Sequence, residues 1–236
     1  MAYVSKKLFT LLFADDTNTF LTGKDTNHLI KTMNEELKKL VDYIKSKIAK
    51  GIGIICKVRN ILNVSTLINL YNCFVYPYIN YAIEIWGDTY DCYIDPIYKL
   101  QKKTLRIITR SNVREHSSPL FEKFKLLDVE RIHIYKIGLT MFKVSHKCVP
   151  NVFAQLFTHN CNIYLYDTRQ SIQLHVPISR TDYLMHAVSV KGVRIWNILT
   201  TKINNDCSLL CFKHQLKNFL LATENITSVF NPNRLN

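Results

Sequence analysis

Residues 99–110 read Lys-Leu-Gln-Lys-Lys-Thr-Leu-Arg-Ile-Ile-Thr-Arg, and two kinds of side chain recur in them with the period of an α-helix. We expect a helix from Ile94 to Thr109, in which successive side chains are about 100° apart. Its cations then fall on one side: Lys99, Lys102, Lys103, Arg106 and Arg110. The other side is mainly apolar: Ile97, Leu100, Thr104, Ile107 and Ile108. Such a helix can pack on a core with one face and meet a phosphate backbone with the other.

Two interpretations of this cationic stripe remain open at the level of sequence. A charged helix face is often simply solvated. Here, however, no acid interrupts the stripe, which favours a polyanionic partner. The whole chain agrees with that, because its 236 residues carry a formal net charge of +13, and nucleic acid is the commonest partner of strongly basic proteins.

The composition indicates a chain that can bury a core. Hydrophobic residues make up 47% of it, and six Gly and six Pro are too few for disorder or for a turn-rich all-β fold. The apolar run near the N-terminus is too short for a secretory signal. With an odd number of cysteines, seven, we expect reduced thiols and an intracellular protein, cytoplasmic or nuclear and not secreted.

Other helices are predicted on both sides of the cationic stretch. Residues 64–86 have an apolar helical face, a possible N-cap at Ser65, and Pro77, where the helix should kink or restart. Residues 60–83 contain no charge, but their asparagines and proline favour a buried helix over a membrane span. Further helices are expected after Pro119, from Asp128 to about Ser145, and around residues 209–220, with a loop-rich segment over 151–190.

The first 21 residues have a different pattern. Residues 8–21 form two β-favouring runs around Asp15 and Asp16, which predicts a β-hairpin with both acids at its tip. Two carboxylates on a rigid turn can hold Mg²⁺, although a solvated surface turn is the commoner outcome. An amphipathic helix follows from about Thr26. If it ran unbroken to Asn60 it would be unusually long, and two glycines would weaken it.

Several of these segments resemble a known family. Residues 13–17, Phe-Ala-Asp-Asp-Thr, resemble the palm motif of reverse transcriptases. Residues 76–87, Tyr-Pro-Tyr-Ile-Asn-Tyr-Ala-Ile-Glu-Ile-Trp-Gly, and residues 99–109 resemble the thumb of non-LTR (LINE-type, jockey-like) retrotransposon enzymes. Residues 166–170 and 192–199 resemble the region that follows the polymerase. The resemblance implies a palm remnant over 1–42, a helical thumb-like region over 43–147 and a post-polymerase region over 148–236.

The resemblance also implies a fold and an activity. The expected fold is mainly α with a small β-hairpin, a helical thumb bundle attached to a truncated palm and a loop-rich C-terminal region. The parent activity is RNA-directed DNA polymerisation, with Mg²⁺ at Asp15 and Asp16. The family's further catalytic carboxylate lies on a strand upstream, and this sequence starts fourteen residues before Asp15. We therefore expect no polymerase activity and no Mg²⁺ held by this chain alone.

The same comparison suggests an internal deletion. The segment that this family has between its palm and its thumb is missing from the sequence near Asp42. What the chain could retain is contact with RNA or an RNA–DNA duplex through the five cations, without a membrane or a small-molecule cofactor. Two alternatives stay open. The chain could be a helical protein-interaction remnant without a nucleic-acid role, or a pseudogene product.

A metal site of another kind is suggested by Cys207, Cys211 and His214, which are ligand-type residues at helical spacing. A structural zinc site needs four ligands, and no second pair stands at the usual spacing. His159 and Cys161 would have to complete it from a distant part of the chain.

Overall fold

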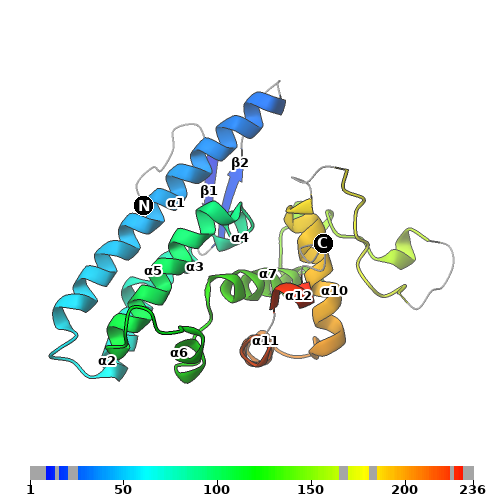
Figure 1. Cartoon of the computed structure of the whole chain (residues 1–236). Coiled ribbons are helices and arrows are strands. Elements are labelled where there is room, and N and C mark those ends of the chain that lie inside the picture. Colours follow the sequence, from blue (N-terminus) through cyan, green and yellow to red (C-terminus); the bar gives the residue numbers. More distant parts are fainter. Residues whose placement is uncertain are drawn as a thin grey trace. The chain divides into compact units, whose positions relative to one another are not determined.

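The computed structural model describes residues 9–13, 16–20, 26–164, 170–180, 185–223 and 226–230. Helices dominate these residues, which confirms the mainly α fold (Figure 1). The chain divides into two compact units, Met1–Phe124 and Lys125–Asn236. Among the described residues, no helix is long and apolar enough to cross a membrane.

Two short strands open the first unit. Strand β1 (Phe9–Phe13) pairs antiparallel with β2 (Asp16–Phe20), and Phe13 stands opposite Asp16 at one end of the ladder. Asp15 belongs to the two residues between the strands, which lie outside the described part of the chain. The structure therefore describes no side-chain geometry for the predicted acid pair.

Helix α1 (Thr26–Val58) runs for 33 residues and passes through Asp42 and Tyr43 without a break. The continuous helix considered from the sequence is thus the one observed. Its buried apolar side chains recur every three or four positions, which keeps them on one face: Val41, Ile44, Ile48, Ile52 and Ile55. Gly51 lies on the same side, where an added Cβ would be 2.6 Å from the carbonyl oxygen of Phe74. The glycine lets the next helix approach α1 closely.

Three short helices follow where the sequence predicted one interrupted helix. They are α2 (Val64–Phe74), α3 (Tyr76–Asn80) and α4 (Ile83–Trp86). The interruption confirms the effect of Pro77, which lies in the first turn of α3, where its missing N–H costs no helical bond. The predicted cap was wrong, because the side chain of Asn63, not Ser65, accepts the hydrogen bond from the Thr66 N–H at 2.8 Å.

Helix α5 (Asp91–Thr109) begins three residues before the predicted start and ends at the predicted residue. It packs against α1 and α2, and Figure 1 shows α5 running beside α1. Helix α6 (Ser118–Lys123) follows, with Pro119 in its first turn as predicted. The core of this unit holds large side chains from several helices, among them Tyr71, Trp86, Ile97 and Leu105.

The second unit is built around α7 (Val129–Ser145), which packs against α10 (Val193–Lys202) and α11 (Leu209–Ala222). Phe142 of α7 stacks on Phe212 of α11, with ring centroids 4.4 Å apart, and meets Trp196 of α10 edge-on at 6.4 Å. Helix α12 (Ile226–Phe230) also packs against α10. The three aromatic rings therefore join three helices that are far apart in the sequence.

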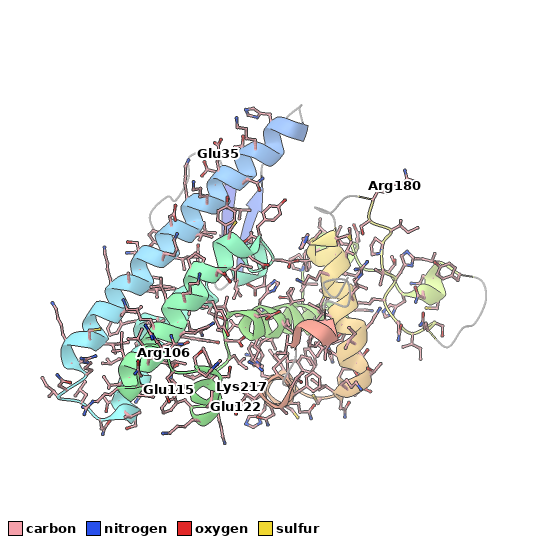
Figure 2. The ribbon with its side chains drawn as sticks, viewed as in Figure 1. Glu35, Arg106, Glu115, Glu122, Arg180 and Lys217 are labelled. Atoms are coloured by element: carbon pink, nitrogen blue, oxygen red, sulfur yellow. The ribbon has the colours of Figure 1, made fainter. Side chains whose placement is uncertain are left out.

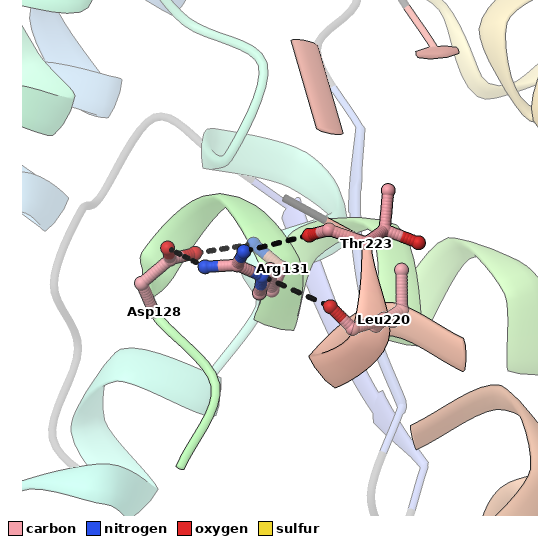
Figure 3. A network of polar contacts seen from close by, with 4 residues as sticks. All are labelled: Asp128, Arg131, Leu220 and Thr223. Carbon is pink, nitrogen blue, oxygen red and sulfur yellow. Dashed lines mark hydrogen bonds and ion pairs between the residues drawn. The ribbon is translucent and has the colours of Figure 1, made fainter. Parts of the chain in front are cut away.

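One polar network ties the start of α7 to the end of α11 (Figure 3). The carboxylate of Asp128 caps α7, as predicted, by accepting from the Arg131 N–H at 2.8 Å. The guanidinium of Arg131 donates to that carboxylate at 2.7 Å, to the carbonyl of Leu220 at 3.0 Å and to that of Thr223 at 2.8 Å. Because the last carbonyls of a helix have no partner within it, Arg131 closes the C-terminal end of α11.

The segment between α7 and α10 has little regular structure, as the sequence predicted. It contains α8 (Asn151–Ala154), the 3₁₀ turn η1 (Asn160–Asn162) and the π-turn η2 (Val188–Gly192). Asn197 of α10 holds this segment by exchanging two hydrogen bonds with the backbone of Leu174, at 3.1 and 2.8 Å.

Candidate nucleic-acid interface

The buried side of α5 fixes which side of the helix faces solvent. The buried residues are Ile97, Gln101, Thr104, Leu105 and Ile108. Gln101 donates a buried hydrogen bond of 2.9 Å to the hydroxyl of Tyr71 on α2, which sets the rotation of α5. Leu100 and Ile107, predicted on the apolar side, are only half-buried. The buried face of α5 is thus rotated about the helix axis relative to the predicted apolar face, toward Gln101 and Leu105.

Four of the five predicted cations lie within α5, opposite this buried face, and the fifth, Arg110, directly follows the last residue of the helix. At 100° per residue their mean direction is roughly 180° from it. Lys99, Lys103 and Arg110 are exposed, whereas Lys102 and Arg106 are half-buried. We call these five residues the α5 basic face.

Three of these cations are held in place by neighbouring groups. The ammonium of Lys102 lies over the ring of Tyr98, 3.6 Å from its centroid, an arrangement that attracts the cation to the ring. Arg106 donates through Nε to the carbonyl of Glu115 at 2.9 Å, and Figure 2 shows both residues at one end of the first unit. Arg110 donates through Nη2 to the carbonyl of Arg59 at 2.9 Å. Each arginine keeps further N–H groups for an anion.

Arg110 also ends the helix. Its backbone is left-handed, with φ of 56°, and its N–H bonds to the carbonyls of Arg106 and Ile107. A left-handed residue commonly terminates a helix in this way. The backbone therefore directs the Arg110 side chain out of the helical path and toward the end of α1.

One acid stands at the N-terminal edge of the α5 basic face. Asp95 lies 3.9 Å from the ammonium of Lys99, one helical turn away, with side chains 59% and 75% exposed. An exposed pair of this length contributes little and is screened by salt. As expected, residues 96–114 contain no acid, but Asp95 directly precedes them.

Sequence reasoning missed two arginines next to this face. Arg59 follows α1, and its carbonyl receives the hydrogen bond from Arg110. Arg114 is exposed in the loop after α5, next to Glu115, whose carbonyl holds Arg106. A signal for Arg59 was present, because residues 43–83 contain no acid but several cations. Its place beside Arg110 depends on the packing of α1 against α5.

The second unit is basic as well. Its described residues include eleven Lys and Arg and three acids, Asp128, Glu130 and Asp206. Asp128 is ion-paired with Arg131. A polyanion could therefore be attracted to either unit, and an experiment on the α5 basic face has to separate the two.

Two metal sites were considered from the sequence, and only the cysteine–histidine one lies wholly within the described part of the chain. Asp15 lies outside it, and Asp16 is described only as the first residue of β2. No group of three or more His, Cys, Asp and Glu residues within that part is placed to hold a metal ion. Of the zinc candidates, His214 shares a contact of 3.2 Å with the amide of Asn218. All seven cysteines are free.

No protein-family model matches the sequence, and comparisons with curated proteins and with solved structures found no significant match. The assignment of a function therefore depends on the residues and on the geometry of the α5 basic face.

Proposed function

We propose that this chain binds the phosphate backbone of a nucleic acid, independently of sequence, through the α5 basic face. The observation that carries the proposal is the position of four cations opposite the buried side of one helix, with a fifth, Arg110, at its C-terminal end. Because this buried side is fixed by Gln101 and its neighbours, the four cations within α5 share one direction, and Arg110 follows at the end of the helix. Backbone contacts from Lys and Arg supply most of the sequence-independent affinity for nucleic acids.

The dimensions of the face suit such a ligand. From Lys99 to Arg110 the helix rises by roughly 16 Å, at 1.5 Å per residue. With one charge per roughly 3.4 Å of each strand, this length lies beside about five phosphates of one strand. Arg106 and Arg110 are pre-positioned by carbonyls, which reduces the side-chain entropy lost on binding.

The proposed ligand is an RNA–DNA duplex, and the proposed origin of the chain is a non-LTR reverse transcriptase. Residues 76–87 and 99–109, which resemble the thumb of that family, support this choice. A thumb would hold the product duplex by its backbone. The α5 basic face belongs to the second of these two segments, so resemblance and geometry suggest the same surface.

The test is the salt dependence of binding to a 20-base-pair RNA–DNA duplex, followed by fluorescence anisotropy between 50 and 200 mM salt. Lys103→Gln removes one cation that is exposed and lies on the α5 basic face. The matched control is Lys38→Gln, an exposed lysine of α1 three residues from Glu35. Figure 2 places Glu35 and Arg106 far apart within the first unit.

Each backbone contact contributes about 0.9 to the slope of log K against log salt. We expect the slope of Lys103→Gln to be smaller than that of the wild type by about this amount, and the slope of Lys38→Gln to be unchanged. Equal slopes for all three proteins would remove the α5 basic face from the proposal. No binding at 50 mM salt would remove the proposal itself and leave the protein-interaction alternative.

A further inference from the structure

Two stretches of the second unit, residues 158–164 and 170–175, are held side by side, and we call them together the η1 loop. Three backbone hydrogen bonds of 3.0, 3.1 and 2.8 Å join them, from the N–H groups of Asn160, Cys161 and His175 to the carbonyls of Gln173, Ser171 and Thr158. The loop is fixed to α10 through Leu174, which is buried and exchanges two hydrogen bonds with Asn197. Its backbone is therefore anchored to the helices of this unit.

Tyr164 has a defined position on the η1 loop. Its N–H donates to the carbonyl of Asn160 at 2.9 Å. Its ring meets the ring of His175 edge-on, with centroids 5.9 Å apart and planes at 62°, a favourable arrangement of two aromatic rings. Nδ1 of His175 lies 3.3 Å from Oδ1 of Asn160, whose Nδ2 donates to the carbonyl of Gln170 at 2.9 Å. Asn160 thus holds Tyr164 both directly and through His175.

The ring that is held in this way remains open to solvent. Tyr164 is 52% exposed, and two more large apolar side chains of the η1 loop, Ile163 and Ile172, are 44% and 85% exposed. Single exposed apolar residues are common on protein surfaces, whereas several on one element indicate an interaction surface. The η1 loop therefore presents apolar side chains from an anchored backbone.

The charge of the second unit indicates the kind of partner. Its described residues include eleven Lys and Arg but only three acids, which favours an anionic partner. The partner must also offer a flat apolar surface to an aromatic ring. A single-stranded nucleic acid combines both properties, because its bases can leave the stack and lie against aromatic side chains.

We propose that Tyr164 is a stacking platform for an unpaired base of a single-stranded nucleic acid. Because every base has an aromatic face, such a contact tolerates any sequence. The contacts with Asn160 and His175 fix the ring before the ligand arrives, which reduces the entropy lost on binding. The platform lies in the second unit, and the proposal does not depend on the α5 basic face.

The experiment titrates the full chain into a single-stranded dodecanucleotide that carries one 2-aminopurine, at 200 mM salt, where contacts to phosphates alone are weakened. We expect the fluorescence of 2-aminopurine to fall on binding, because stacking quenches it. Tyr164→Ala should bind about tenfold more weakly and without this quenching. Tyr164→Phe keeps the aromatic ring and should match the wild type. The control is Tyr90→Ala, which removes a tyrosine of the first unit that is 68% exposed and should change neither quantity.

Three results would overturn the proposal. Tyr164→Ala could bind the oligonucleotide as tightly as the wild type, or Tyr164→Phe could lose as much affinity as Tyr164→Ala. The third is binding to anionic lipid vesicles that depends on Tyr164, without binding to the oligonucleotide. Binding of the blunt RNA–DNA duplex is measured separately, so failure of the stacking platform and failure of the proposed function are distinguishable.

Discussion

Gly51 and Gly53 stand two residues apart in α1, and we predict opposite effects when each is replaced by alanine. Both glycines lie in a helix interior, where the sequence suggested that they weaken the helix. The structure gives the two glycines different surroundings. Gly51 is buried under the end of α2, whereas Gly53 is exposed and has no atom within 4 Å of an added Cβ.

The magnitudes follow from these surroundings. Gly53→Ala should stabilise the first unit by about 1 kcal/mol, the usual difference in helix propensity. Gly51→Ala has the same gain, but its Cβ would lie 2.6 Å from the carbonyl oxygen of Phe74 and 3.2 Å from the Phe74 Cβ. Backbone atoms cannot rotate away, so α2 must shift, at a cost of about 1–3 kcal/mol. The two variants should therefore differ by about 1–3 kcal/mol in the free energy of unfolding.

The assay is urea unfolding followed by tryptophan fluorescence. The chain has two tryptophans, Trp86 in the first unit and Trp196 in the second. In a Trp196→Phe background, the signal comes from Trp86, which is fully buried in the first unit. With a slope of about 2 kcal/mol/M, the predicted difference corresponds to about 0.5–1.5 M in the midpoint. Equal midpoints, or a higher midpoint for Gly51→Ala, would refute the close packing of α2 on α1.

Two further predictions concern the second unit. Arg131→Ala should destabilise it by about 2–4 kcal/mol, because three hydrogen bonds of a largely buried guanidinium are lost. The control is Arg194→Ala, at an exposed position of α10, which should change the stability of the second unit by less than about 0.5 kcal/mol. If the two variants lost equal free energy of unfolding in urea, the Arg131 network would be contradicted. Burial raises the pKa of Tyr135 in the folded protein above its value in the unfolded chain, which is about 10. The contribution of Tyr135 to stability is therefore complete below about pH 10 and is lost as the pH rises through the pKa of the folded state. Between pH 9 and 12, the free energy of unfolding should fall less for Tyr135→Phe than for the wild type. If the two proteins lost stability in parallel over this range, the prediction would be contradicted.

Local patterns in the sequence were enough to place most helices. The period of apolar residues located α5, α7 and α11, and the two prolines at helix starts, Pro77 and Pro119, were interpreted correctly. The cap of α2 was not, because Asn63 and Ser65 both have suitable side chains and only the backbone conformation decides between them. Helix caps depend on dihedral angles that composition does not specify.

Contacts between distant residues could not be predicted in the same way. Arg59 and Arg110 are 51 positions apart, and their hydrogen bond exists because α1 packs on α5. Gly51 seemed a weak point of α1 until Phe74 was seen against it. The five cations of the α5 basic face were found from periodicity alone, whereas Arg59 and Arg114 required the fold. The roles of Asp15 and Asp16 stay predictions, since the structure does not describe their side chains.

The central claim is that the α5 basic face contacts the nucleic acid, and lysine footprinting tests it most directly. The full chain is acetylated briefly with and without the RNA–DNA duplex, and the extent of modification at each lysine is measured by mass spectrometry. We predict protection of Lys99 and Lys103, with Lys38 and the exposed Lys217 of the second unit unchanged. Unchanged reactivity at Lys99 and Lys103 while the duplex is bound, or protection confined to the second unit, would contradict the claim.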